Sequence, residues 1–236
     1  MSCPSKETAR WSSTTETTSP TRTGSATRAK TSTSARAPTA SSPVAETRAE
    51  ELRAKAPDPR EVQRARAIVA AFNAPDPEQA ADQERILRFL DDHQDALLRT
   101  CLPGHLTASC LLLDASRERV LLHHHRKLDL WLQFGGHADG EGDLASVARR
   151  ELLEESGINP SEFASEPFDL DIHLIPAHKS EPAHEHLDVR YMATAPQKAT
   201  FVRSEESNSL EWFTGQEASA LGLDPSLARM IEFALG

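Results

Sequence analysis

The chain has 236 residues, of which 38% are hydrophobic, and a formal net charge of −10 at pH 7. This length allows one sizeable domain with an extension, or two small domains. The first 50 residues hold seven Lys/Arg and four Asp/Glu, so residues 51–236 carry a net charge of −13. Such an acidic region argues against binding nucleic acid through phosphate neutralisation, and it suits a protein that recruits cations to hold an anionic substrate.

Cysteine usage and hydropathy indicate the compartment. Cys3, Cys101 and Cys110 form no CxxC pair, which argues against a disulfide framework or a zinc ribbon. No apolar run approaches the roughly 18–20 residues that span a bilayer. The N-terminus also lacks the apolar centre of a secretory signal. We therefore expect a reducing, cytoplasmic setting and no membrane partner.

The N-terminal part of the chain predicts two different segments. Residues 1–43 are mostly Ser, Thr, Ala and Arg, so they are expected to be a disordered, low-complexity leader, and a dispensable leader is favoured over a transit peptide or a basic interaction tail. Residues 44–99 are expected to form a helical extension that packs on the main domain. Its helices are predicted over 58–73 and 76–99, because each begins with Asp-Pro, a good helix start.

Residues 100–236 predict the main domain. Short apolar or alternating runs predict strands at 105–114, 120–125, 131–134, 168–176, 186–195 and 210–213. The first two form a hairpin, the third leads into a turn at Gly135-Gly136, and the fourth is half-buried because apolar residues alternate with mostly polar ones. Helices are predicted at 144–156 and 224–235. Strands interleaved with helices indicate a mixed sheet in an α/β or α+β domain.

The helix predicted at 144–156 has an inward stripe that changes from apolar to acidic. Asp143 is a suitable N-cap and Gly157 a suitable residue to end the helix. Helical spacing places these residues on one stripe: Leu144, Val147, Ala148, Glu151, Glu154 and Glu155. Three ionised carboxylates repel one another, so either one takes a proton or a divalent cation such as Mg²⁺ or Mn²⁺ lies among them. A solvated, charged helix end is the alternative.

Residues 136–158 resemble the Nudix box, the signature of the Nudix hydrolase family. The family pattern is Gly, five residues, Glu, seven residues, and then Arg-Glu-aliphatic-any-Glu-Glu-any-Gly-aliphatic. The matching residues are Gly136, Arg150, Glu151, Leu152, Glu154, Glu155, Gly157 and Ile158. The one departure is Gly142, where the family has a supporting Glu. This change affects the anchoring of the loop more than the metal site.

The resemblance covers about residues 100–235. Over this range the sequence is similar to a bacterial Nudix subgroup in which a GGH sequence opens the box. It implies a Nudix-type α/β/α sandwich around a mixed sheet. It also implies hydrolysis of the pyrophosphate bond of a nucleoside diphosphate linked to another moiety, with Mg²⁺ or Mn²⁺ as cofactor. The alternatives are a Nudix-fold sensor of a nucleotide metabolite without catalysis and an isoprenoid-diphosphate isomerase. The substrate and a homodimeric assembly stay open.

Site residues carried over from the resemblance fall into two groups. The metal ligands expected are Gly136, Glu151, Glu154 and Glu155, and the catalytic residues expected are Glu155, Glu154 and Arg150. Glu155 is the preferred general base, and Arg150, although off the stripe, can orient a neighbouring acid. Glu206, with Glu205 beside it, is an alternative base on a loop.

Four further residues are candidate substrate ligands: His137, His124, Arg126 and His186. His184 and His186 share one face of a strand and are a possible metal pair, but the sequence shows no third ligand, so substrate contact is favoured for His186. Trp131 is expected in the core rather than as a stacking platform for a base.

Overall fold

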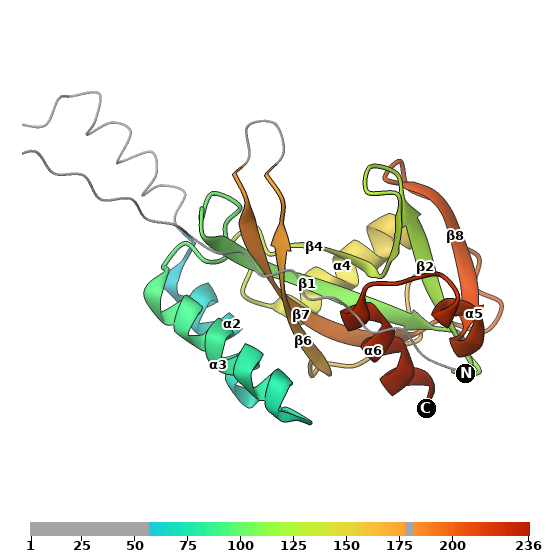
Figure 1. Cartoon of the computed structure of the whole chain (residues 1–236), viewed down its shortest axis with the longest axis horizontal. Helices are drawn as coiled ribbons and strands as arrows, with labels where there is room; N and C mark the ends of the chain where they lie inside the picture. The colour runs from blue at the N-terminus through green and yellow to red at the C-terminus, as the bar shows by residue number, and fades with distance from the viewer. Residues whose placement is uncertain (1–56, 178–181) are drawn as a thin grey trace, which may run out of the picture. The chain divides into compact units, whose positions relative to one another are not determined.

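The computed structural model of the chain describes residues 57–177 and 182–236 (Figure 1). All of them belong to the second of the two units into which the chain divides, Pro43–Gly236. The leader predicted at 1–43 lies outside the described residues. Within the described ranges, no helix has both the length and the apolar character needed to cross a membrane.

Two N-terminal helices begin where their Asp-Pro pairs predict. Helix α2 spans Pro59–Ala71, and the carboxylate of its N-cap, Asp58, accepts a hydrogen bond from the N–H of Arg60. Helix α3 spans Pro77–Asp92, with Asp76 as its N-cap. The prediction that this helix continues to residue 99 is wrong. The backbone turns extended at His93, and residues 94–100 form turns from which Ala96 and Leu97 still fill the core.

One mixed sheet of eight strands is formed by the described residues. Its strands are β1 (Gly104–Leu113), β2 (Arg119–His125), β3 (Leu130–Leu132), β4 (Phe134–His137), β5 (Glu162–Phe163), β6 (Asp169–Ile175), β7 (His184–Thr194) and β8 (Ser207–Thr214). The central strand β1 pairs in parallel with β7 and antiparallel with β2 and β4. Strand β6 pairs antiparallel with β7, and β8 pairs antiparallel with β2.

The single strand predicted at 131–134 is in fact two strands that meet at Gln133. Strand β3 closes a hairpin with β2, whereas β4 pairs with β1, so the chain changes partner between them. As a consequence the predicted turn at Gly135-Gly136 is also wrong, because both glycines lie within β4. The short strand β5 was not predicted.

Helices cover both faces of the sheet, as the α/β/α sandwich requires (Figure 1). Helix α4, Leu144–Ser156, has the predicted bounds, and α6 spans Pro225–Leu235. Successive β1 side chains point to opposite faces. Leu106, Ala108, Cys110 and Leu112 share a core with the α4 residues Val147, Ala148 and Leu152. Leu111 and Leu113 share the second core with Leu227, Met230 and Ile231 of α6. The short helix α5, Gly215–Ser219, was not predicted.

Strand β6 departs from its predicted burial pattern. Its polar residues Asp169 and Asp171 are buried, whereas Leu174 is 65% exposed. The cause lies on the neighbouring strand β7, where Arg190 is only 2% exposed and needs carboxylate partners. Leu170 stays fully buried in the core, so the buried cation has added a buried polar face to the strand beside its apolar one.

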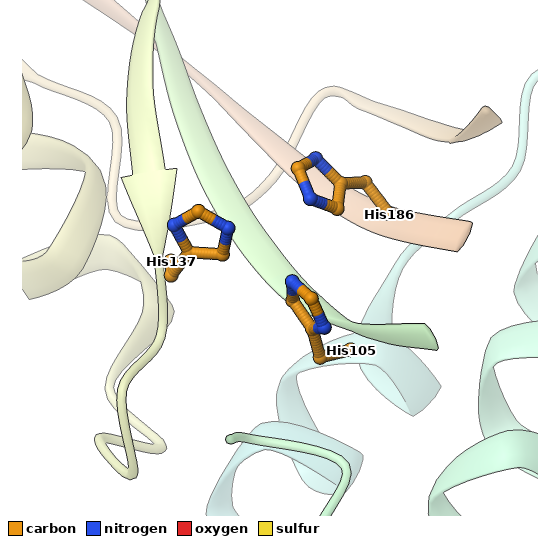
Figure 2. Close-up of side chains that lie close together, drawn as sticks. All are labelled: His105, His137 and His186. Carbon is orange, nitrogen blue, oxygen red and sulfur yellow. The ribbon is translucent and has the colours of Figure 1, made fainter. Parts of the chain in front are cut away.

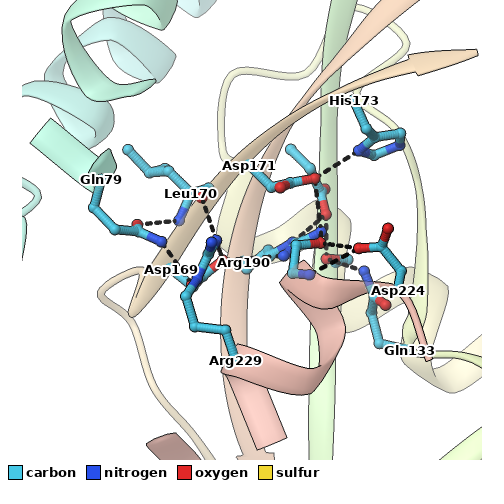
Figure 3. A network of polar contacts seen from close by, with 12 residues as sticks. Gln79, Gln133, Asp169, Leu170, Asp171, His173, Arg190, Asp224 and Arg229 are labelled. Atoms are coloured by element: carbon cyan, nitrogen blue, oxygen red, sulfur yellow. Dashed lines mark hydrogen bonds and ion pairs between the residues drawn. The ribbon is translucent and has the colours of Figure 1, made fainter. Parts of the chain in front are cut away.

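Arg190 is the centre of a buried polar network (Figure 3). Its guanidinium donates to Asp188 at 2.9 Å, Asp171 at 2.9 Å and Asp169 at 3.1 Å. Asp169 also accepts from Gln79 of α3 and Arg229 of α6. The network thus connects two helices to the middle of the sheet. Burial opposes the charge of Arg190, but the surrounding carboxylates raise its pKa, so it stays protonated.

Replacing Arg190 with Met should lower the free energy of unfolding by about 3–5 kcal/mol, because it leaves buried carboxylates without their cation. The measurement is chemical denaturation followed by circular dichroism. Arg66→Met is the control, since Arg66 pairs with Asp91 on the surface, where such a pair is worth at most about 1 kcal/mol. Equal effects of the two changes would contradict this account of the network.

Candidate active site

The acidic end of α4 lies directly against the backbone of β4. A Cβ atom at Gly136 would come within 2.5 Å of the carboxylate of Glu151, so only glycine permits this approach. The N–H of Gly135 donates a hydrogen bond of 3.0 Å to Oε2 of Glu155. Two of the three predicted glutamates are therefore held against a strand, and the solvated helix end considered from the sequence is not observed for them.

The three glutamates differ in burial. Glu155 is 7% exposed, Glu151 is half-buried and Glu154 is exposed. Burial raises the pKa of Glu155 to about 8; the Gly135 N–H opposes this shift, and the charges of Glu151, Glu206 and Glu154 add to it. Burial also raises the pKa of Glu151, and Arg150 opposes that shift. Acids in this setting favour protonation unless a cation compensates their charge.

Arg150 joins the loop before α4 to the acids of the helix. It donates to Glu141 at 2.6 Å and to Glu151 at 3.3 Å. The structure therefore shows the contact through which Arg150 can orient an acid.

Convergence of all three glutamates is not seen. In the described part of the chain, two groups of three ligand-type side chains have ligand atoms that all lie within 4.8 Å of one another: His105 with His137 and His186, and His93 with Asp95 and Cys101. The three glutamates do not form such a group, and Glu154 is exposed. Its side chain has rotatable bonds on the surface, so a change of rotamer is enough to reorient it.

Gly142 has a structural reason to differ from the family pattern. Its N–H donates a hydrogen bond of 2.8 Å to Oε2 of Glu61, on helix α2. A Cβ at this position would lie 1.9 Å from the carbonyl oxygen of Glu61, so the backbone of α2 occupies the space of any side chain there. Arg64, one turn further on, pairs with Asp143 at 2.5 Å. Helix α2 therefore anchors the loop, a contact that no local pattern in the sequence indicates.

The loop that carries Glu206 passes the other end of α4. The N–H of Val202 donates to the carbonyl of Ser156, the last residue of the helix, at 2.8 Å. Glu206 itself is exposed, and its charge contributes to the raised pKa of Glu155. The structure thus brings this alternative base into electrostatic range of the buried glutamate.

The candidate substrate ligands separate into two pairs. His137 of β4 and His186 of β7 lie together with His105 of β1, with ring centroids 4.9–5.0 Å apart (Figure 2). Sequence reasoning missed His105, because only the parallel pairing of β1 with β7, which sets it opposite His186, reveals the contact. Burial lowers the pKa of all three, that of His137 to about 4, so their imidazoles are neutral at pH 7.

The second pair lies at the end of β2. His124 packs against Trp131 at 5.1 Å and contacts Asn208 through Nδ1, while Arg126 is exposed. Within residues 57–177 and 182–236, no hydrogen bond or ion pair joins either residue to the three glutamates of α4 or to the histidine group, but the N–H of Arg126 donates to the carbonyl of Glu206 at 2.7 Å. Trp131 also packs edge-on against Phe213 beside the second core, which fits its predicted place.

Comparisons with known proteins agree on one family. The sequence pattern of the NUDIX domain matches residues 103–233. No curated protein matches the chain. A NUDIX family hydrolase from Clostridium perfringens is 25% identical, covers 56% of this chain and 95% of its own, and has a TM-score of 0.43. The Escherichia coli dihydroneopterin triphosphate pyrophosphohydrolase is 19% identical, with 54% and 92% covered and a TM-score of 0.45.

A third similar structure is the NUDIX domain of Shewanella oneidensis NrtR complexed with ADP ribose. It is 17% identical and covers 62% of this chain and 94% of its own, with a TM-score of 0.44.

Changing Gly142 to Ala should destabilise the protein by about 1–3 kcal/mol, because the added methyl group overlaps the backbone of α2. Thermal unfolding gives the difference. Gly215→Ala is the control, since its Cβ would meet only Leu235, at an ordinary 3.6 Å. A Gly142→Ala protein as stable as wild type would show that α2 does not pack tightly on the loop.

Proposed function

Because the chain belongs to the NUDIX domain family, and is therefore a hydrolase of pyrophosphate bonds, we propose that it cleaves a nucleoside diphosphate linked to another moiety, with Mg²⁺ or Mn²⁺ as cofactor. The observation that carries the proposal is the position of Glu155. It is buried, fixed by the Gly135 N–H, and lies beside Glu151 at the strand that opens the box.

Four groups would hold the divalent ion: the carboxylates of Glu151, Glu154 and Glu155 and the backbone carbonyl of Gly136. These donors fit the ion, because hard cations prefer oxygen ligands and the buried acids favour a compensating charge. When bound, the ion would neutralise diphosphate oxygens and lower the pKa of a water molecule.

The chain's own residues would position the reacting groups. Arg150 holds Glu151, and the Gly135 N–H holds Glu155, so neither acid has to be ordered during the reaction. We assign Glu155 as the general base that takes the proton from the attacking water. Glu206 is the alternative, because its loop can deliver a carboxylate to the same place.

The candidate substrate ligands form two pairs, and the proposed substrate has two ends. We propose that His137 and His186 contact one moiety beside the diphosphate and that His124 and Arg126 contact the other. The two pairs lie on different strands of the sheet, so each would contact a different moiety.

The isomerase alternative is disfavoured by the cysteines of the described residues. Cys101 and Cys110 are both buried, and burial raises the pKa of both thiols, that of Cys101 to about 12. A buried, protonated thiol is a poor reactive group. The intact glutamates favour the hydrolase over a sensor that does not cleave its ligand.

The single variants Glu155→Gln and Glu154→Gln should each lower turnover by at least about 100-fold, because each removes a carboxylate from the proposed metal and base site. Release of phosphate or nucleotide from a panel of nucleoside diphosphate derivatives, with Mg²⁺, is the measurement. Gln at 155 can still accept the Gly135 N–H, so the fold should survive. Glu162→Gln, an exposed change on β5, should have no effect.

Two outcomes would overturn the proposed function. Full activity in both the Glu154 and Glu155 variants would contradict the proposed mechanism. Tight binding of a nucleotide by the wild-type protein, with no product from any substrate of the panel, would identify a sensor.

Helix α2 should affect the reaction through Glu61, which is a positioning residue. Glu61→Ala should lower kcat by roughly 10-fold or more with a smaller change in KM, because the loop before α4 loses its anchor. Glu61→Gln should restore most of kcat, since its amide oxygen can accept the same N–H. Glu84→Ala, an exposed change on α3, is the control. An unchanged kcat in Glu61→Ala would exclude this role.

A further inference from the structure

Three histidines from three strands converge outside the carboxylate site. His105 comes from β1, His137 from β4 and His186 from β7, and one ring nitrogen of each faces the space between them (Figure 2). Their ligand nitrogens all lie within 4.8 Å of one another. Zinc–imidazole bonds of roughly 2.0–2.1 Å to a common ion would draw these nitrogens closer together.

Burial without partners distinguishes this group from surface histidines. His105 is 3% exposed, and neither of its ring nitrogens has a hydrogen-bond partner; Nε2 of His186 is also buried and unpaired. The backbone of Cys101 partly opposes the lowering of the His105 pKa, but makes no hydrogen bond to the ring. Buried polar atoms almost always have a partner, so the unpaired nitrogens indicate a ligand.

Neighbouring histidines do not supply that partner. His184 stacks on His105 at 4.9 Å, but its Nδ1 bonds to the carbonyl of Pro182. His173, 5.4 Å from His186, has its Nδ1 bonded to Asp171. Each of these two rings keeps its Nε2, but only His105, His137 and His186 have ligand atoms that all lie within 4.8 Å of one another.

We propose that His105, His137 and His186 form a binding site for a divalent transition-metal ion, most naturally Zn²⁺. Imidazole nitrogen suits zinc and its transition-metal neighbours, whereas Mg²⁺ requires oxygen ligands. Three histidines leave one tetrahedral position open, as in zinc sites that also bind a water molecule or a ligand oxygen. The site does not involve the carboxylates of the proposed hydrolase. The same ring nitrogens of His137 and His186 cannot bind both zinc and a substrate moiety, so zinc binding is the alternative to the substrate contact proposed above for these two residues.

The site is separate from the carboxylates although the two share a strand. Gly136 pairs with Ala108, on the face covered by α4, and lies against Glu151. His137 is the next residue and points to the other face, opposite Thr107. Removal of one set of ligands should therefore leave the other site intact.

The test uses the full-length protein, stripped of metal by a chelator and then titrated with Zn²⁺ in excess Mg²⁺ by isothermal calorimetry. Wild type should bind one equivalent. His105→Gln, His137→Gln and His186→Gln should each weaken binding at least about 100-fold, because even partners that only support a metal ligand are worth 10–100-fold. Glu155→Gln should bind zinc as wild type does.

The matched control is His184→Gln, which changes a ring stacked on His105 without removing a proposed ligand. It should keep wild-type affinity. The Tm of each metal-free protein shows whether the variant still folds. Adding zinc should then raise the Tm of wild type and of His184→Gln, but not that of the other three histidine variants. Should a variant fail to fold, Co²⁺-loaded wild type still reports its ligands through its absorption bands and through shifted imidazole proton signals.

Three results would overturn the assignment. The first is absence of zinc binding by wild type in excess Mg²⁺, which would leave water as the partner of the rings. The second is loss of zinc binding in Glu155→Gln with retention in the histidine variants, which would place the zinc among the carboxylates. The third is a loss in His184→Gln equal to that in His105→Gln. Phosphate release, measured separately, tests the hydrolase function.

Discussion

The close approach of α4 to β4 is the constraint on which the site depends. Because residue 136 has no side chain, the carboxylate of Glu151 can lie against the strand, and because residue 135 offers a free N–H, Glu155 can be buried with one hydrogen bond. The core explains why the helix cannot withdraw. Val147, Ala148 and Leu152 are fully buried on the same helix, so the apolar packing that stabilises α4 also forces its acidic end inward.

A second contact makes the N-terminal helices part of the site. The family pattern has a glutamate where this chain has Gly142, and here the backbone of α2 fills the space and Glu61 supplies a carboxylate to the loop. The anchoring group therefore comes from 81 residues earlier in the chain. Arg64 and Asp143 add a charged contact at the adjacent position. The extension predicted to pack on the main domain therefore contacts the loop that precedes α4.

The features that were predicted correctly depend on residues that lie close together in the sequence. The bounds of α4 follow from Asp143, Gly157 and the helical period, all contained within one short stretch, and both N-terminal helices begin at their Asp-Pro pairs. The failures involve partners distant in the chain. The break at Gln133 arises because β3 pairs with β2 whereas β4 pairs with β1, and the buried acids of β6 depend on Arg190. Helical spacing put Glu154 on the same stripe as Glu155, but it could not predict which of them the strand would cover.

The histidine group is a second case in which the sequence alone did not reveal a contact between distant residues. From the sequence, His184 and His186 were a possible metal pair, but substrate contact was favoured for His186; the two histidines that lie beside it follow the Gly-Gly pair and begin β1. Only the register of a parallel and an antiparallel pairing sets His105 and His137 next to it. Strand β4 then presents a glycine to the acids on one face and a histidine to imidazoles on the other. Since oxygen ligands favour hard cations and imidazoles favour transition metals, two adjacent residues of one strand can serve two ions without competition.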